Sequence, residues 1–211
     1  MSVSLRRRPL PMFQQQAKLA LENTQLRHNL GKATQTIRDK RAVMVSEVPD
    51  WEQLREAGRL DSAISELERR TASEPRAAEY PAALGQAYLQ KCSVIQDVRE
   101  QGILAMQADK LFDNALSLDP SNWEARFTKA VALTYWPASM NKGDEIIEHF
   151  QTLIQQQEAQ SPQPQFAETY VLLGDQFQKA GQNDDARSIW ARGAGLYPND
   201  EKLSKKLASA Q

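Results

Sequence analysis

The sequence predicts an all-α protein, a stack of short helix pairs preceded by one long amphipathic helix. In residues 167–200, we expect two antiparallel helices that approach each other closely at the small residues Gly174 and Ala186. Such an approach requires large side chains opposite the small ones. The large residues are Tyr170, Phe177 and Trp190. In residues 14–47, apolar residues recur at spacings of three, four and seven, the period of one helical face.

The ends of the helices in residues 167–200 are marked as well. Gly181 is expected to end the first helix, and Pro198 follows the second, where its missing N–H and locked φ prevent continuation. With Leu173, these positions resemble a tetratricopeptide repeat, a helix–turn–helix unit of about 34 residues. The resemblance implies a non-enzymatic scaffold or adaptor that binds other proteins, and it does not name the partner.

The same resemblance extends over most of the chain. We expect a tetratricopeptide domain at residues 50–200, with a degenerate first repeat at 50–75, repeats at about 78–120 and 123–158, and a last repeat at 167–200. A C-terminal capping helix follows at 200–211. The repeat at 78–120 is eleven residues too long, so its extra residues either lengthen both helices or form an excursion around Cys92 and Gly102.

The N-terminal region has a different charge. Residues 1–48 hold nine Lys and Arg against three Asp and Glu, a net charge of +6, whereas the rest holds 17 against 24, a net charge of −7. We expect a flexible basic tail at 1–11 and a basic helical arm at 12–48, whose apolar stripe packs on the repeats, on a second copy of itself, or on a different protein. The basic residues offer an alternative function, binding of nucleic acid or an anionic surface. They are Arg6, Arg7, Arg8, Lys32, Arg38, Lys40 and Arg41.

A second resemblance covers roughly residues 13–58, where the run Pro49-Asp50-Trp51-Glu52 follows Leu26-Arg27 and Leu30. This region is similar to the N-terminal helical segment of the lactate-utilisation iron-sulfur proteins. It contains none of that family's cluster-binding cysteines. The resemblance therefore implies at most an accessory role beside such a redox complex.

The residues for catalysis or metal binding are scarce. Cys92 is the only cysteine, so one chain can form neither a disulfide nor a cysteine-rich metal or cluster site, and a buried inert thiol is expected. His28 and His149 are far apart in sequence. The chain has no phosphate-binding glycine loop and no Gly-x-Ser-x-Gly motif, so we expect no enzyme, no cofactor and no metal. Without an apolar run of about 18 residues, we expect a cytoplasmic protein.

The tetratricopeptide resemblance also implies a concave groove lined by the first helix of each repeat. The implied groove residues are Ala82, Gln86, Leu89, Phe127, Val131, Thr134, Val171, Asp175 and Gln178. They are apolar or neutral with one acid, and they lack the lysines and asparagines that clamp a terminal carboxylate in the chaperone-binding members of the family. We therefore expect a helix or extended peptide with an apolar face and a basic residue near Asp175. One candidate is the chain's own arm, docked on the same chain or exchanged between copies.

Overall fold

The computed structural model describes residues 50–209. The chain divides into two units, residues 1–49 and 50–211, and the described residues belong to the second. The expected basic tail at 1–11 and the helical arm at 12–48 lie outside the described residues. The same holds for the seven basic residues assigned to them, Arg6, Arg7, Arg8, Lys32, Arg38, Lys40 and Arg41.

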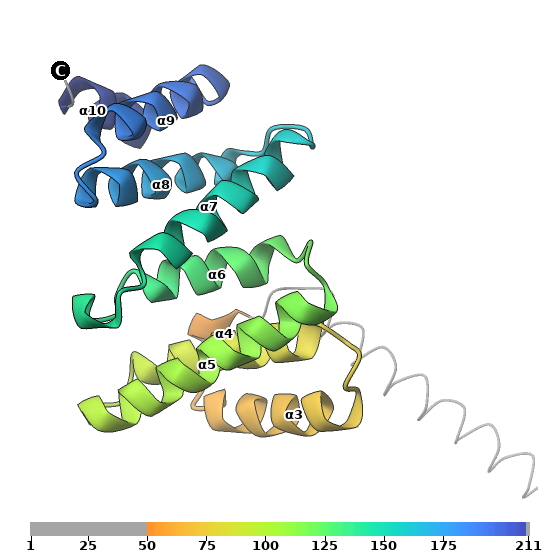
Figure 1. Cartoon of the computed structure of the whole chain (residues 1–211). Helices are drawn as coiled ribbons and strands as arrows, with labels where there is room; N and C mark the ends of the chain where they lie inside the picture. The colour runs from red at the N-terminus through yellow and green to blue at the C-terminus, as the bar shows by residue number, and fades with distance from the viewer. Residues whose placement is uncertain (1–49, 210–211) are drawn as a thin grey trace, which may run out of the picture. The chain divides into compact units, whose positions relative to one another are not determined.

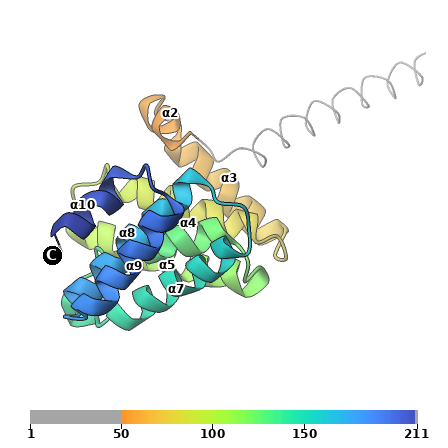
Figure 2. The same cartoon turned by 90° about the horizontal axis from the view of Figure 1, so that it is seen from above.

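The described residues fold into nine α-helices and two short 3-10 turns, without a β-strand among them. The helices are α2 (Trp51–Glu56), α3 (Leu60–Ser73), α4 (Glu79–Cys92), α5 (Val98–Leu118), α6 (Trp123–Leu133), α7 (Gly143–Glu158), α8 (Ala167–Lys179), α9 (Asn183–Leu196) and α10 (Glu201–Ser209). The turns are η1 (Ala138–Met140) and η2 (Pro164–Phe166). Figure 1 shows the helices stacked in chain order from α3 to α10, and Figure 2 looks down the same stack. The expected all-helical repeat fold is confirmed for this part of the chain.

Side chains that accept backbone N–H groups mark several helix starts. Asp50 accepts from the Gln53 N–H at 2.9 Å before α2, and Asn122 accepts from the Ala125 N–H at 2.9 Å before α6. Asp200 accepts from the Leu203 N–H at 2.9 Å and so caps α10, the C-terminal helix expected at 200–211. Each such bond satisfies a donor that has no partner within its helix.

Most of the extra residues of the second repeat lengthen its second helix, because α5 has 21 residues against 14 in α9, whereas α4 has 14 against 13 in α8. α4 runs to Cys92 and α5 starts at Val98, which leaves a connection of five residues, and Gly102 lies inside α5. Gln101 holds this connection by donating to the Ile95 carbonyl at 2.6 Å. Cys92 is partly buried, and burial raises the pKa of its thiol, which disfavours the reactive thiolate. The excursion that we considered as an alternative does not form in this described part of the chain.

Close contact between paired helices depends on glycine facing an aromatic ring. A Cβ atom added to Gly174 of α8 would lie 2.1 Å from Nε1 of Trp190 in α9. A Cβ atom added to Gly85 of α4 would lie 2.9 Å from the ring of Phe112 in α5. Because real Cβ atoms do not approach other atoms so closely, these helices could not pack in this way with a larger residue at either position.

The apolar core has several parts. One cluster of buried residues draws on α6 to α10 and includes Phe150, Tyr170 and Trp190. A second cluster joins α4 and α5 around Phe112, and the residue that α6 adds to it is Ala125. A third joins α3 and α4 through Ile64 and Leu84. The core is thus thin where α5 meets α6.

Candidate functional site

The nine expected groove residues lie on the first helices of three pairs, α4, α6 and α8, or directly after α6 in the case of Thr134. Ala82 and Val171 are buried, with 7% and 5% of their surface exposed, and therefore offer almost no area to a partner. Gln178 is exposed. The six that are partly buried are Gln86, Leu89, Phe127, Val131, Thr134 and Asp175.

Gln86 joins three helices through its side-chain amide. It accepts from Nε1 of Trp51 in α2 at 3.2 Å, and it donates to the Glu124 carboxylate in α6 at 3.2 Å. Side chains on successive first helices therefore reach one another at this position. Gln86 of α4 and Glu124 of α6 thus lie on the same side of the stack.

Asp175 has a partner within the chain. Its carboxylate lies 2.6 Å from Nζ of Lys206 in α10, and the ammonium of Lys206 also lies 5.4 Å from the centre of the Trp190 ring. A basic residue of a binding partner would have to share this carboxylate with Lys206. Lys206 of the capping helix α10 therefore competes with a binding partner for Asp175.

Phe127 is the largest of the expected groove residues. Its ring stacks on Trp123 with 4.8 Å between ring centres, and it meets the Phe150 ring edge-on with 6.4 Å between ring centres. Trp123 in turn lies 5.4 Å from Phe166. Stacked and edge-on contacts of this kind hold aromatic rings in place. Phe127 is therefore a rigid apolar feature on α6.

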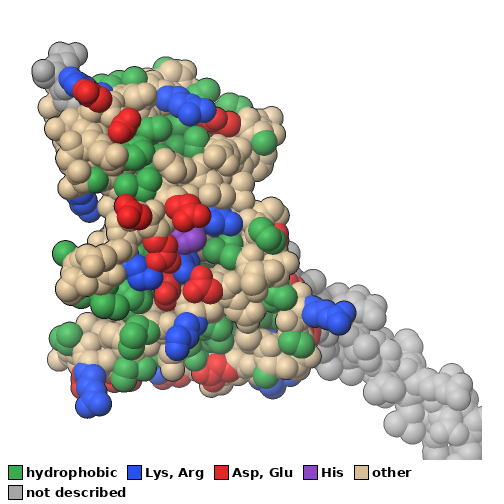
Figure 3. Space-filling view, in the orientation of Figure 1, with side chains coloured by type: hydrophobic (Ala, Val, Ile, Leu, Met, Phe, Trp, Pro, Cys, Tyr) green, Lys and Arg blue, Asp and Glu red, His purple; other side chains and the backbone are tan. Residues whose placement is uncertain are grey.

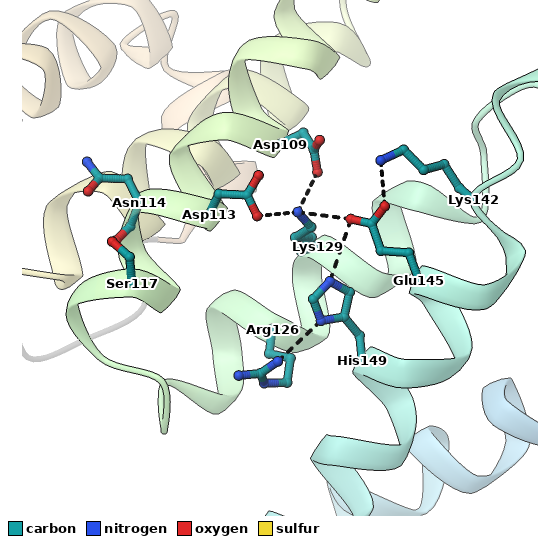
Figure 4. A network of polar contacts seen from close by, with 9 residues as sticks. All are labelled: Asp109, Asp113, Asn114, Ser117, Arg126, Lys129, Lys142, Glu145 and His149. Atoms are coloured by element: carbon teal, nitrogen blue, oxygen red, sulfur yellow. Dashed lines mark hydrogen bonds and ion pairs between the residues drawn. The ribbon is translucent and has the colours of Figure 1, made fainter.

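A network of charged side chains lies between α5, α6 and α7 (Figure 4). We call it the charged layer. Its members are Asp109 and Asp113 of α5, Arg126 and Lys129 of α6, Lys142 just before α7, and Glu145 and His149 of α7. With His149 neutral, three cations face three carboxylates.

Lys129 is the centre of the charged layer. Its side chain is 3% exposed, and its Nζ lies 3.0 Å from Asp109, 2.5 Å from Asp113 and 3.2 Å from Glu145. Burial alone would lower the pKa of Lys129, but the two aspartates of α5 outweigh it and raise that pKa. Lys129 therefore stays charged and links α5 to α7.

His149 lies beside two cations. Nη1 of Arg126 lies 3.3 Å from Nδ1 of His149, and since a guanidinium carries only donors, Nδ1 must accept this bond. Burial, followed by the charges of Lys129 and Arg126, lowers the pKa of His149. Its Nε2 is buried without a hydrogen-bond partner among the described residues, and Glu145 is 3.8 Å away. The imidazole is therefore neutral at pH 7.

Reasoning from sequence did not find the charged layer, although one signal was available. Lys129 precedes the small residue Ala130 in α6, just as Leu84 precedes Gly85 in α4 and Leu173 precedes Gly174 in α8. A lysine thus occupies a position that is buried and apolar in the neighbouring pairs. Figure 3 shows its surroundings as a group of blue, red and purple side chains in the middle of the visible face.

Solved structures of helical repeat proteins resemble this fold. A thermophilic tetratricopeptide protein of Thermus thermophilus is 16% identical, with a TM-score of 0.57 over 92% of this chain and 97% of that chain. MamA is 18% identical, with a TM-score of 0.58 over 76% and 82%. PilF of Pseudomonas aeruginosa is 15% identical, with a TM-score of 0.60 over 82% and 68%. The fold is that of a tetratricopeptide-repeat protein.

At these identities the likeness concerns the tetratricopeptide fold alone. No family model and no curated protein matches the sequence. The resemblance of residues 13–58 to the lactate-utilisation proteins therefore gains no support, and most of that stretch lies outside the described residues.

The second helices of the last two tetratricopeptide pairs enclose two shallow pockets of about 360 and 400 Å³ between α7 and α9. Both are lined by Glu158 and Arg192, which form an ion pair across the gap. None of the nine expected groove residues lines either pocket.

Residues 50–209 lack two further kinds of feature, a metal site and a membrane-spanning helix. No group of three or more His, Cys, Asp or Glu side chains in this part is placed to hold a metal ion. No helix in it is both long enough and apolar enough to span a membrane.

Proposed function

We propose that this protein is a non-enzymatic scaffold that binds a segment of a partner protein along the first helices of its pairs, α4, α6 and α8. The observation that carries the proposal is the side-chain bridge from Trp51 of α2 through Gln86 of α4 to Glu124 of α6, which links successive helices along one side. A surface made of equivalent positions on successive helices suits an elongated ligand.

The chemistry of this surface favours an apolar segment. Leu89, Phe127 and Val131 are partly exposed, and Phe127 is held by Trp123. Glu124 is exposed, whereas Asp175 is already paired with Lys206. A basic side chain of the partner therefore finds a freer carboxylate on α6 than on α8, beside a rigid aromatic ring.

A capture experiment tests this function. The full chain and a Thr134→Arg/Gln178→Arg variant are immobilised, and proteins retained from lysate at low and high salt are compared. An arginine at Val171 is avoided because that side chain is buried, whereas Gln178 is exposed and Thr134 partly so. We expect the variant to lose partners that the full chain retains at high salt, because two long cations would obstruct an apolar ligand.

The matched control places the same charges on a second helix. Gln151 and Gln155 of α7 are not buried, so Gln151→Arg/Gln155→Arg should fold and retain the partners. Equal loss in both variants would contradict binding at the first helices. A chain without residues 1–48 separates the alternative. If that chain alone loses its bound material, and salt removes the material from the full chain, the basic segment is the binding element.

A further inference from the structure

Charged groups replace apolar packing between α5 and α6 in the part of the chain that the structure describes. The apolar cluster of α6 to α10 includes no residue of α5. The cluster around Phe112 takes only Ala125 from α6. Besides Ala125, two polar links span this boundary: Lys129, bonded to Asp109 and Asp113 of α5, and the hydrogen bond from Gln86 of α4 to Glu124 of α6. The cohesion of the stack at this level therefore depends in part on the charge state of a few side chains.

The layer holds one imidazole, His149, and imidazole is the side-chain group whose ordinary pKa, 6.5, lies nearest neutral pH. Its ring faces Arg126 and Lys129 from α6 and Glu145 and Glu148 from α7, while α5 contributes Asp109 and Asp113 around Lys129. Neutral His149 accepts from Arg126 through Nδ1. A protonated imidazole has no acceptor, so protonation would break this bond and place two cations 3.3 Å apart.

The nearby carboxylate is not free to offset this repulsion. Glu145 lies 3.8 Å from His149, but it is already bonded to Lys142 at 2.5 Å and to Lys129 at 3.2 Å. A stronger attraction to His149 would draw Glu145 from Lys129. The contact that links α7 through Lys129 to α5 would weaken as a result.

We propose that the charged layer is a pH-sensitive joint between α2–α5 and α6–α10, closed while His149 is neutral and loosened when His149 takes up a proton. Loosening would move α6, which carries Phe127 and Val131, relative to α4. A partner bound along both helices would then be released as the pH falls, a consequence that rests on the proposed function.

The direction of the pH effect follows from the pKa of His149. Burial and the two cations hold this pKa below the ordinary value of 6.5, so the open or unfolded chain binds the proton more readily than the closed one. The contribution of neutral His149 to the stability of the closed state is therefore complete above about pH 6.5. It is lost as the pH falls through the lower pKa that His149 has in the folded state.

Hydrogen–deuterium exchange of the full chain tests the joint without any partner, so its outcome is independent of the proposed function. His149→Gln keeps an acceptor for Arg126 but cannot take up a proton, and His28→Gln is the matched control because His28 is the only other histidine. Variants are compared at the same pH, so that intrinsic exchange rates cancel. At pH 7.5 all three chains should agree. At pH 5.5 the wild type and His28→Gln should exchange faster than His149→Gln in α6 and in the facing parts of α5 and α7.

Three results would overturn the proposal. The first is equal exchange of wild type and His149→Gln at pH 5.5. The second is faster exchange spread evenly over α3 and α9, because that is a general loss of stability. The third is a His28→Gln variant that behaves like His149→Gln. An NMR titration of the wild type serves if His149→Gln folds poorly, since a His149 ring that titrates at or above the ordinary histidine range also contradicts the joint.

Discussion

At the scale of single residues, Gly174 leaves the least room for a side chain among the glycines of the described residues, because Trp190 lies directly against it. The indole Nε1 donates to the Val171 carbonyl at 3.2 Å, so the ring is held against the backbone of α8 and has little freedom to withdraw. Trp190 is 1% exposed. A side chain at position 174 would therefore have to displace a fully buried ring.

We predict that Gly174→Ala destabilises the protein. The added methyl would lie 2.1 Å from the indole, and such overpacking costs up to about 3 kcal/mol of unfolding free energy. Urea unfolding followed by circular dichroism measures the loss. Gly195→Ala is the control, because a Cβ there meets nothing within 4 Å. Alanine has the higher helix propensity, so this substitution should raise the unfolding free energy by about 0.5–1 kcal/mol. Equal effects of the two substitutions would contradict the close contact.

Lys129 gives a second prediction for a single residue. Lys129→Met should lower the unfolding free energy by about 3 kcal/mol, since removing one partner leaves uncompensated charges at a buried site. Lys142→Met removes a lysine that is 26% exposed, against 3% for Lys129, and should cost far less. Thermal unfolding of both variants at pH 7.5 makes the comparison. A Lys129→Met protein as stable as the wild type would show that the ion pairs contribute nothing.

At the scale of helices, α10 closes the stack with one buried anchor. Leu203 is 0% exposed, and a Cβ on Gly193 of α9 would lie 3.1 Å from its Cδ1, so the two helices are in close contact. Lys206 adds its ion pair with Asp175 at the same interface. Leu203 and Lys206 lie one turn apart on α10, a helix of nine residues.

We predict that Leu203→Ala costs about 3 kcal/mol, within the range for emptying a fully buried leucine site. Lys205→Ala is the control on the same helix, because the Lys205 side chain is 78% exposed. Urea unfolding of the two variants checks the difference. If Leu203→Ala had no larger effect than Lys205→Ala, α10 would not be anchored to α9 as described.

The order and type of the helices could be predicted because local residues determine them. As the sequence indicates, Gly181 has a φ of +78° after α8, Pro198 follows α9, and a further helix, α10, lies within residues 200–211. The long second repeat could not be resolved, because the same extra residues can extend a helix or form a loop. The choice depends on tertiary contacts such as that of Gln101 with the Ile95 carbonyl.

The candidate site was less predictable than the helices. The position of a residue along a helix indicates which side of the helix it lies on, but not how far the neighbouring helices cover it. For this reason the burial of Ala82 and Val171 could not be predicted. The charged layer depends on residues 16 and 20 positions apart, Asp113 and Asp109 against Lys129. A charged residue at an apolar position is explained only when the packing brings its partners together.

At the scale of the whole molecule, stability in a repeat protein is distributed among neighbouring units and their interfaces. Ile64 lies in the cluster of α3 and α4, and Leu173 lies in the cluster of α6 to α10. The charged layer, the Gln86–Glu124 bond and the buried Ala125 span the boundary between these parts. The two parts should therefore respond separately to damage in their cores.

We predict that Ile64→Ala increases hydrogen exchange in α3 to α5 and leaves α8 and α9 unchanged, whereas Leu173→Ala does the reverse. Each substitution empties a buried site, with 6% and 1% of the residue exposed, and should cost about 2–5 kcal/mol within its own part. Exchange followed by mass spectrometry at pH 7.5 assigns the effect to each helix. The two variants serve as controls for each other, because they differ mainly in which part they damage. If either raised exchange evenly from α3 to α9, the stack would unfold as one cooperative unit, and the charged layer would transmit stability as well as an apolar core does.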